Sequence, residues 1–194
     1  MNKAVFIDKD GTLIKDIPYN VDPAKIELEA HAKSALTMLK GHGFKLIVIS
    51  NQSGVAHGYF KEDSLQIVSD RIQQLLRSEN ISIDAFYFCP HHPEAVDERY
   101  AIACICRKPQ PGLILRATKD FSIDTSSSWM IGDILHDVEA GNTAGCNTIL
   151  LDNGHETEWL TNEKRWPNYI VKNLQEAARI ILQNTKDGSA SKLF

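Results

Sequence analysis

Long hydrophobic runs and an excess of positive charge are both missing from this chain. Its 194 residues include 21 Lys and Arg against 25 Asp and Glu, which gives a formal net charge of −4. This balance offers no electrostatic argument for nucleic acid or an anionic membrane surface as the main partner. No apolar run approaches the roughly 18 residues that span a bilayer, and the apolar run at the N-terminus is too short for a signal peptide. We therefore expect a cytoplasmic protein that captures anionic ligands through local groups.

Cysteine is scarce, with 4 residues in the chain. Three of them cluster in the sequence with a histidine, as Cys89, His91, Cys104 and Cys106. In a reducing compartment such a cluster indicates a metal more than disulfides, and a Cys₃His set is typical of structural zinc. His92 competes with His91 as the fourth ligand, and Cys146 is expected to be a small buried residue.

The four ligands would fill a tetrahedral zinc site and leave no position for a catalytic water. We therefore interpret the zinc as a staple for the long loop from Cys89 to Cys106. Since Cys106 directly precedes Arg107 and Lys108, the staple would also hold these two cations in place.

Short apolar runs alternate with amphipathic stretches along the chain. Six runs have the length of strands: 4–7, 45–49, 85–88, 129–131, 147–151 and 169–171. Helical patterns precede Gly41 and cover residues 65–76, 112–119, 136–143 and 174–182. This alternation predicts an α/β fold with a parallel sheet covered by helices on both faces. We expect one domain over residues 1–183, a poorly ordered tail over 184–194 and a monomer.

Four of the apolar runs are followed by residues whose side chains can act as nucleophiles or metal ligands, namely Asp8, Ser50, Cys89 and Asp133. In an open α/β sheet, ligands bind beyond the carboxyl ends of the strands. These residues should therefore gather along one edge of the sheet.

The segment Asp8-Lys9-Asp10-Gly11-Thr12-Leu13 directly follows the first run. A turn at Gly11 would let one carboxylate attack as a nucleophile while the other transfers protons. Asp8 and Asp10 also supply the hard oxygen ligands that suit Mg²⁺. Taken alone, the segment is also compatible with an acidic turn.

Two further segments suit a phosphate. Ser50-Asn51-Gln52-Ser53-Gly54 offers a hydroxyl and loop N–H groups, and Arg107-Lys108-Pro109 forms a positive arm before a helix. Lys108 would neutralise charge on a transferring phosphoryl group, and the planar fork of Arg107 would hold a second oxyanion. Taken singly, a polar turn and a solvated basic loop remain the simpler interpretations.

The last segment is Gly132-Asp133-Ile134-Leu135-His136-Asp137. Asp133 stands where a carboxylate at the end of a strand completes an Mg²⁺ site. Asp137 follows about one helical turn later and would support the loop or the metal. A helix with an acidic first turn is the alternative.

The order of these segments is more specific than any one of them. Asp8 and Asp10, then Ser50, then Lys108, then Asp133 and Asp137 match the four motifs of the haloacid-dehalogenase-like (HAD-like) superfamily of phosphotransferases, which residues 3–152 resemble. The resemblance implies a Rossmann-like HAD fold. No insertion after Asp10 or Ser50 is long enough for a large cap domain, so we expect an open site with the zinc loop as its main wall.

The Cys/His loop, Asn51 to Ala56 and Pro111-Gly112-Leu113 are similar to the D-glycero-D-manno-heptose 1,7-bisphosphate phosphatase family. This resemblance implies that Asp8 attacks phosphorus and that Asp10 acts as acid and base. It also implies that Mg²⁺ is held by Asp8, the Asp10 carbonyl and Asp133. The implied substrate contacts are Asp16, Ile17, Pro18, Tyr19, Ser50, Asn51, Gln52, Ser53, Arg107 and Lys108. The implied reaction removes the C7 phosphate and yields heptose 1-phosphate for lipopolysaccharide or surface glycans.

The chain departs from that family at three positions. Ser50 replaces a frequent threonine and keeps the hydroxyl. Ile134 stands where some members carry lysine, and some members carry an arginine near the position of His57. The departures bear on anomer preference and substrate identity. Histidinol phosphate or another small phosphomonoester is an alternative substrate. A receiver-like signalling domain phosphorylated on Asp8, or a zinc-stapled interaction module without catalysis, is an alternative of another class.

Overall fold

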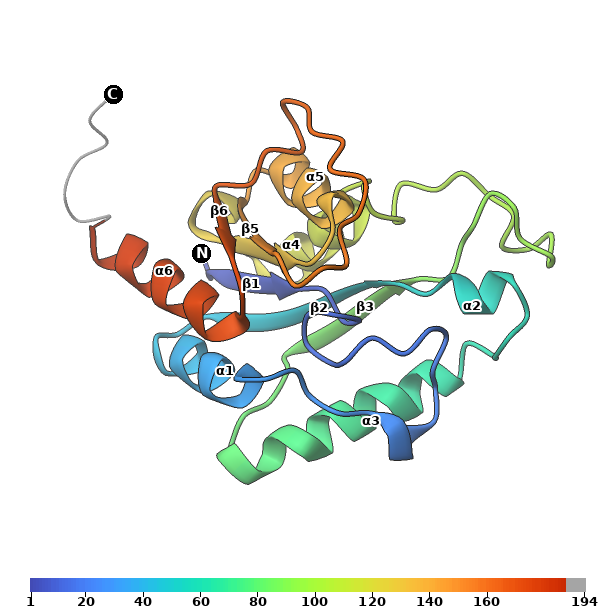
Figure 1. Ribbon diagram of the computed structural model, residues 1–194, viewed down its shortest axis with the longest axis horizontal. Coiled ribbons are helices and arrows are strands. Elements are labelled where there is room, and N and C mark those ends of the chain that lie inside the picture. Colours follow the sequence, from blue (N-terminus) through green and yellow to red (C-terminus); the bar gives the residue numbers. More distant parts are fainter. Residues whose placement is uncertain (188–194) are drawn as a thin grey trace.

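The computed structural model describes residues 1–187 and contains one six-stranded parallel sheet (Figure 1). The strands are β1 (Ala4–Ile7), β2 (Lys45–Asn51), β3 (Ala85–Cys89), β4 (Trp129–Gly132), β5 (Asn147–Leu151) and β6 (Tyr169–Val171). All six predicted strands are confirmed. β2 and β3 run on to Asn51 and Cys89 because these two residues pair with each other in the ladder.

The helices are α1 (Ala32–Gly41), α2 (Ser53–Ala56), α3 (Ser64–Leu76), α4 (Gly112–Phe121), α5 (Leu135–Ala144) and α6 (Leu174–Asp187). Short 3₁₀ turns lie at Pro23–Lys25, Arg77–Glu79 and Thr125–Ser127. Five of the helices were predicted from their apolar periodicity. The four-residue α2 was not, because it is too short to show a period.

Two apolar layers hold the sheet between its helices. On one face, β1 and β2 pack against α1, α3 and α6 through residues such as Ile7, Leu36, Ile72 and Ile181. On the other face, Phe6 and its neighbours pack against α4 and α5. Figure 1 shows the two groups of helices on opposite sides of the sheet. The predicted three-layer α/β architecture is confirmed.

The strand order is β3-β2-β1-β4-β5-β6, so the direction of chain progression reverses between β1 and β4. Crevices form at such a switch point, beyond the carboxyl ends of the strands. Ile7 pairs with Ile131, so the residues that follow these two strands leave the sheet side by side. Asp8 and Asp133 are therefore placed at the switch point by topology alone.

The end of the chain requires a correction. The tail predicted for 184–194 begins too early, because α6 continues to Asp187. The Asn184 amide donates to the Ile180 carbonyl, and the Thr185 hydroxyl donates to the Ile181 carbonyl. These bonds extend the helix after its apolar pattern ends. Residues 188–194, the rest of the predicted tail, lie outside the described residues.

Residues 1–187 contain no separately folded cap and no helix long and apolar enough to cross a membrane. The absence of a cap agrees with the sequence prediction.

Candidate active site

A buried lysine stands at the centre of the carboxyl-end crevice. Lys108 Nζ donates to Asp8 Oδ1, lies 2.6 Å from Asp137 Oδ1 and donates to the Ile49 carbonyl at 3.1 Å. Lys108, Asp8 and Asp137 are all buried. Residues 100 positions apart in sequence therefore form one charged cluster, as their places at strand and helix ends predicted.

Negative charge exceeds positive charge in this cluster. Burial raises the pKa of Asp8 well above its ordinary value; Lys108 opposes this rise, and the Asp137 and Asp133 carboxylates reinforce it. Burial and Asp137 likewise raise the pKa of Asp133 to about 6. Against burial, Asp137 and Asp8 keep the pKa of Lys108 above its usual value. One lysine thus faces three buried carboxyl groups.

That imbalance suits a hard dication. One oxygen each from Asp8, Asp133 and Asp137 lies within 4.8 Å of the others. Carboxylate oxygens are the ligands that Mg²⁺ prefers. The side chain of Asp10 does not belong to this group, and the role of its carbonyl toward Mg²⁺ stays an expectation. Asp137 also pairs with Lys108, a contact that the sequence analysis did not predict, and its supporting role toward the metal stays a prediction.

Asp10 is held at the rim of the crevice by two donors. Lys9 Nζ donates to its Oδ1 at 2.8 Å, and Gln52 Nε2 donates to its Oδ2 at 3.0 Å. The same Gln52 amide donates to Ser50 Oγ at 2.7 Å. Since Ser50 Oγ accepts this bond, its own O–H remains available to donate to another acceptor. Asp10 and Ser50 are coupled through a residue predicted to contact substrate.

Asn51 positions Lys108. Its Oδ1 accepts from the Lys108 backbone N–H, and its Nδ2 donates to the Lys108 carbonyl, both at 3.0 Å. The side-chain amide of Asn51, predicted to contact substrate, therefore fixes the backbone that carries the central lysine.

Two glycines allow the close approach of the acidic residues. Gly11 has a φ of +75°, and a Cβ there would stand 2.2 Å from Asp133 Oδ2. A Cβ at Gly132 would stand 2.2 Å from Asp137 Oδ2. Neither position accommodates a side chain without moving a carboxylate of the cluster.

Two neighbouring cavities lie at the site, and both are lined in part by Asp10, Asp16 and Asn51. The larger, about 480 Å³, also reaches Asp8, Lys108 and Asp133. The smaller, about 230 Å³, is lined by predicted substrate contacts, namely Asp16, Pro18, Tyr19, Asn51, Gln52 and Ser53. The space suits a sugar beside a phosphoryl group.

Three predicted substrate contacts, Ile17, Ser50 and Arg107, lie apart from this lining. Ile17 is exposed, and Arg107 Nη1 donates to the His91 carbonyl at 3.2 Å. Their role toward substrate stays a prediction. His57, one of the departures from the family pattern, has its ring centroid 4.8 Å from that of His92 and packs near Tyr19 and Tyr59.

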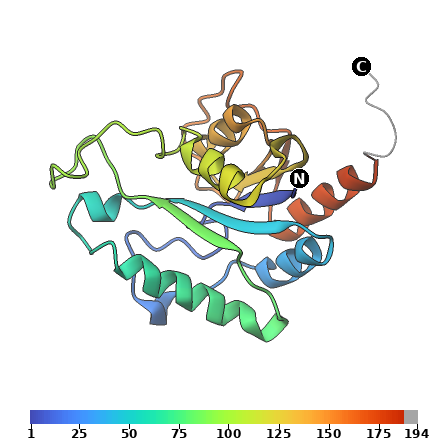
Figure 2. The same ribbon diagram turned by 180° about the vertical axis from the view of Figure 1, so that it is seen from behind.

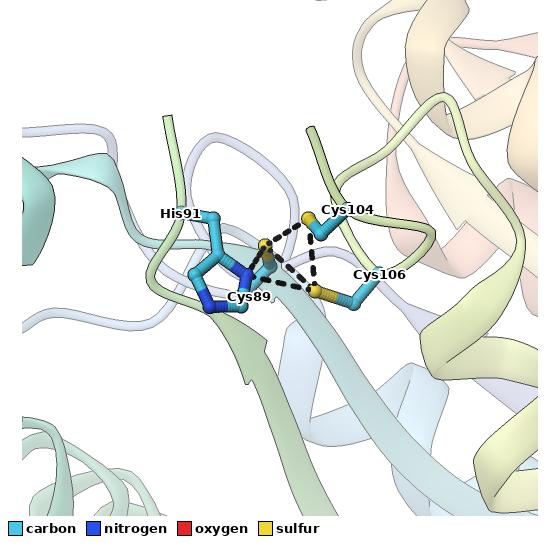
Figure 3. A group of neighbouring side chains, drawn as sticks. All are labelled: Cys89, His91, Cys104 and Cys106. Atoms are coloured by element: carbon cyan, nitrogen blue, oxygen red, sulfur yellow. Dashed lines mark hydrogen bonds between the residues drawn. The ribbon is translucent and has the colours of Figure 1, made fainter. Parts of the chain in front are cut away.

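The Cys/His set converges at the end of β3 (Figure 3). The sulfur atoms lie 3.0 to 3.4 Å apart, and His91 Nδ1 lies 3.2 Å from Cys106 Sγ and 3.6 Å from Cys89 Sγ. All four cysteines are free. A tetrahedral ion with Zn–S bonds near 2.3 Å separates its sulfur ligands by about 3.8 Å. Cys89, His91, Cys104 and Cys106 are thus close enough together to hold one metal ion, and His92 lies outside this group.

The loop between these ligands is anchored on the far side of the crevice. The Val96 N–H donates to the Ala56 carbonyl at 3.0 Å, and the Tyr100 hydroxyl donates to Glu62. Figure 2 shows the loop extending beyond β3 and α2. No residue of this loop is among those that line the two cavities, so its place as the main wall of the site stays a prediction.

One residue at the site escaped sequence reasoning. His155 Nδ1 lies 2.6 Å from Asp133 Oδ2, and His155 lines the larger cavity. The segment Asn153-Gly154-His155 leaves the carboxyl end of β5, the same edge as the other residues. The strand-end rule, applied to the fifth strand as well, would have found it.

Comparison with known proteins agrees with this site. A HAD-hydrolase-like family model matches residues 105–177. The chain is 36% identical to a D-glycero-β-D-manno-heptose-1,7-bisphosphate 7-phosphatase of Pasteurella multocida, over 93% of this chain and 97% of that one. It is 38% identical to the corresponding α-heptose enzyme of Burkholderia mallei, over 77% and 79% of the two chains.

Solved structures are similar as well. A HAD-like phosphatase from Mesorhizobium loti has a TM-score of 0.82 and 31% identity, over 94% of this chain and 87% of that one. The D,D-heptose 1,7-bisphosphate phosphatase of B. bronchiseptica, complexed with magnesium and phosphate, has a TM-score of 0.77 and 25% identity, over 94% of this chain and 99% of that one.

Proposed function

The chain belongs to the D-glycero-D-manno-heptose-1,7-bisphosphate 7-phosphatase family, and from that premise we propose that it removes the C7 phosphate of this heptose bisphosphate. The product is heptose 1-phosphate, a precursor of nucleotide-activated heptose for lipopolysaccharide or surface glycans. The observation that carries the proposal is the buried cluster of Asp8, Lys108 and Asp137, opening onto a cavity of about 480 Å³.

In the proposed reaction, Asp8 attacks phosphorus and forms an aspartyl phosphate. Lys108 holds Oδ1 of Asp8, which leaves Oδ2 as the attacking oxygen. Asp10 gives a proton to the departing C7 oxygen and then takes one from the water that hydrolyses the aspartyl phosphate. The Ser50 hydroxyl and the Lys108 ammonium stabilise the charge on the phosphoryl oxygens.

Mg²⁺ fits the buried acidic group, and Asp8, the Asp10 carbonyl and Asp133 would hold it. When bound, it neutralises negative charge on the phosphoryl group and on Asp8. Asp137 supports the site through Lys108.

Zn²⁺ suits the group of Cys89, His91, Cys104 and Cys106, whose four atoms complete a tetrahedron. We assign it a structural role, since no ligand position is left for water. Elemental analysis of the purified protein, with about one zinc expected per chain, tests this assignment. We further propose a cytoplasmic monomer.

The deciding experiment measures phosphate release with Mg²⁺ from both anomers of the heptose bisphosphate, histidinol phosphate and simple sugar phosphates. The names of the relatives divide between α and β anomers, so both are offered. Asp8→Asn, which keeps the size of the side chain, should reduce turnover by roughly 10⁴-fold or more.

Preference for one heptose anomer, lost in Asp8→Asn, supports both the mechanism and the substrate. Equal turnover of simple sugar phosphates, or preference for histidinol phosphate, overturns the heptose assignment and keeps the phosphatase. A stable phosphorylated Asp8 without turnover would indicate a signalling domain instead.

A further inference from the structure

The segment that follows β5 contacts the loops that carry the acidic residues of the site. Asn153 Nδ2 donates to the Gly11 carbonyl at 2.7 Å, and His155 Nδ1 donates to Asp133 Oδ2 at 2.6 Å. Glu156 Oε2 accepts the Leu135 N–H at the start of α5 at 2.7 Å. One short segment is thus bonded to the loop after β1, the loop after β4 and the first turn of α5.

The contact between His155 and Asp133 depends on the lack of a side chain at Gly11. A Cβ on Gly11 would stand 2.4 Å from His155 Nδ1 and 2.2 Å from Asp133 Oδ2. The bare glycine therefore makes room for both atoms at once. Asp133 is only 5% exposed, while the His155 side chain is 37% exposed and borders the larger cavity. The histidine thus reaches from the surface to a buried carboxylate.

The second oxygen of Asp133 also has a partner. Thr12 Oγ1 donates to Asp133 Oδ1 at 3.3 Å. The carboxylate is held at both oxygens, by a buried hydroxyl on one side and by the imidazole on the other. Because the Thr12 bond is long, the shorter His155 bond is the stronger constraint on the plane of the carboxylate.

We propose that His155 is a positioning residue that orients Asp133 for Mg²⁺, with Asn153 and Glu156 fixing the segment that carries it. This inference rests on the Mg²⁺ site of the proposed function. Hydrogen-bond partners of metal ligands typically change metal affinity or activity by 10- to 100-fold when they are lost. His155 is expected to act through Asp133 and not on the substrate itself.

The test measures binding of Mg²⁺ alone to the whole protein by calorimetry, without substrate. His155→Ala should weaken Mg²⁺ binding about 10- to 100-fold. His155→Asn keeps a donor near the position of Nδ1 and should restore most of the affinity. The matched control is His42→Ala, an exposed histidine that follows α1 at the opposite edge of the sheet. It should leave Mg²⁺ affinity unchanged.

Activity assays complete the test. In His155→Ala, saturating Mg²⁺ should restore kcat to near the wild-type value, because the residue does not touch the reacting atoms. The inference is overturned if His155→Ala binds Mg²⁺ as the wild type does, or more tightly, as it would if the imidazole merely competed with the ion. Failure of the heptose assay with weakened Mg²⁺ binding in His155→Ala would overturn the proposed function and leave this inference standing.

Discussion

A lysine–aspartate cluster lies at each end of the strands, at the carboxyl ends (the carboxyl edge) and at the amino ends (the amino edge). The two clusters differ in whether acidic or basic side chains are in excess. At the carboxyl edge, Lys108 pairs with Asp8 and Asp137, beside a third buried acid, Asp133. At the amino edge, Asp84 pairs with two lysines, Lys40 at 2.6 Å and Lys45 at 3.0 Å, and accepts the Leu46 N–H at 2.9 Å. At the carboxyl edge the carboxylates outnumber the lysine, whereas at the amino edge the lysines outnumber the carboxylate.

The pKa values of the acids follow this balance. Burial and neighbouring carboxylates raise the pKa of Asp8. Burial also acts to raise the pKa of Asp84, but the bonds from Lys40, Leu46 and Lys45 outweigh it and lower the value. The amino edge is arranged to stabilise the folded chain. The carboxyl edge holds carboxylates that repel one another, and a bound dication would neutralise them.

The largest expected effect comes from removing the central cation of the carboxyl edge. Lys108→Met keeps the length of the side chain but removes the charge that, in the proposed reaction, faces the transferring phosphoryl group. We expect kcat to fall by about 10³-fold, measured by phosphate release at saturating Mg²⁺. Lys40→Met, the matched change at the amino edge, should leave kcat within a factor of two. A similar loss in both variants would show that the two edges do not differ in function.

The second prediction compares two glycines with left-handed backbones, one at each edge. Gly11 has a φ of +75° and Gly43 a φ of +80°, yet only Gly11 has atoms close to its missing Cβ. Gly43→Ala should cost only the backbone strain, about 1–2 kcal/mol. Gly11→Ala should cost about 1–3 kcal/mol more, because a carboxylate and an imidazole must move. Denaturant unfolding of both variants measures the difference; equal costs would mean that the carboxyl edge is not crowded.

Much of this arrangement was predictable, because it follows from local patterns. Short apolar runs fixed the strands, and the rule on strand ends brought Asp8, Ser50 and Asp133 to one edge. What escaped prediction depends on contacts between distant segments. The side-chain amide of Asn51 forms hydrogen bonds with the backbone of Lys108. In α2, the Phe60 ring lies so close to Gly54 that it leaves no room for a Cβ there. His155 lies outside every motif that the sequence analysis used, because the strand-end rule was not applied to β5. Its contact with Asp133 shows its place at the site.

The third prediction tests whether the Cys₃His group serves the carboxyl edge. Cys104→Ser should free the loop before Arg107 and Lys108 and lower kcat/KM by about 10- to 100-fold, since small misplacements of a site are costly. The change is measured with Mg²⁺ in excess, beside limited proteolysis of the 92–103 segment. Cys146→Ala, which removes a buried thiol outside the group, is the control. Full activity in a Cys104→Ser protein that has lost its zinc would separate the loop from catalysis.

The smallest expected effect lies at the amino edge and depends on pH. Asp84→Asn should lower the free energy of unfolding at pH 7 by about 1–2 kcal/mol, since its lysine partners are partly exposed, and should leave kcat unchanged. The folded-state pKa of Asp84 lies below the ordinary aspartate value of about 3.9. Its stabilisation is therefore complete above that value and is lost as the pH falls through the folded-state pKa. Urea unfolding of both proteins from pH 7 down to pH 2.5 should show the two stabilities converging in acid. A difference that stays constant over this range would mean that the charge of Asp84 adds nothing, and that the two edges differ in function but not in electrostatic design.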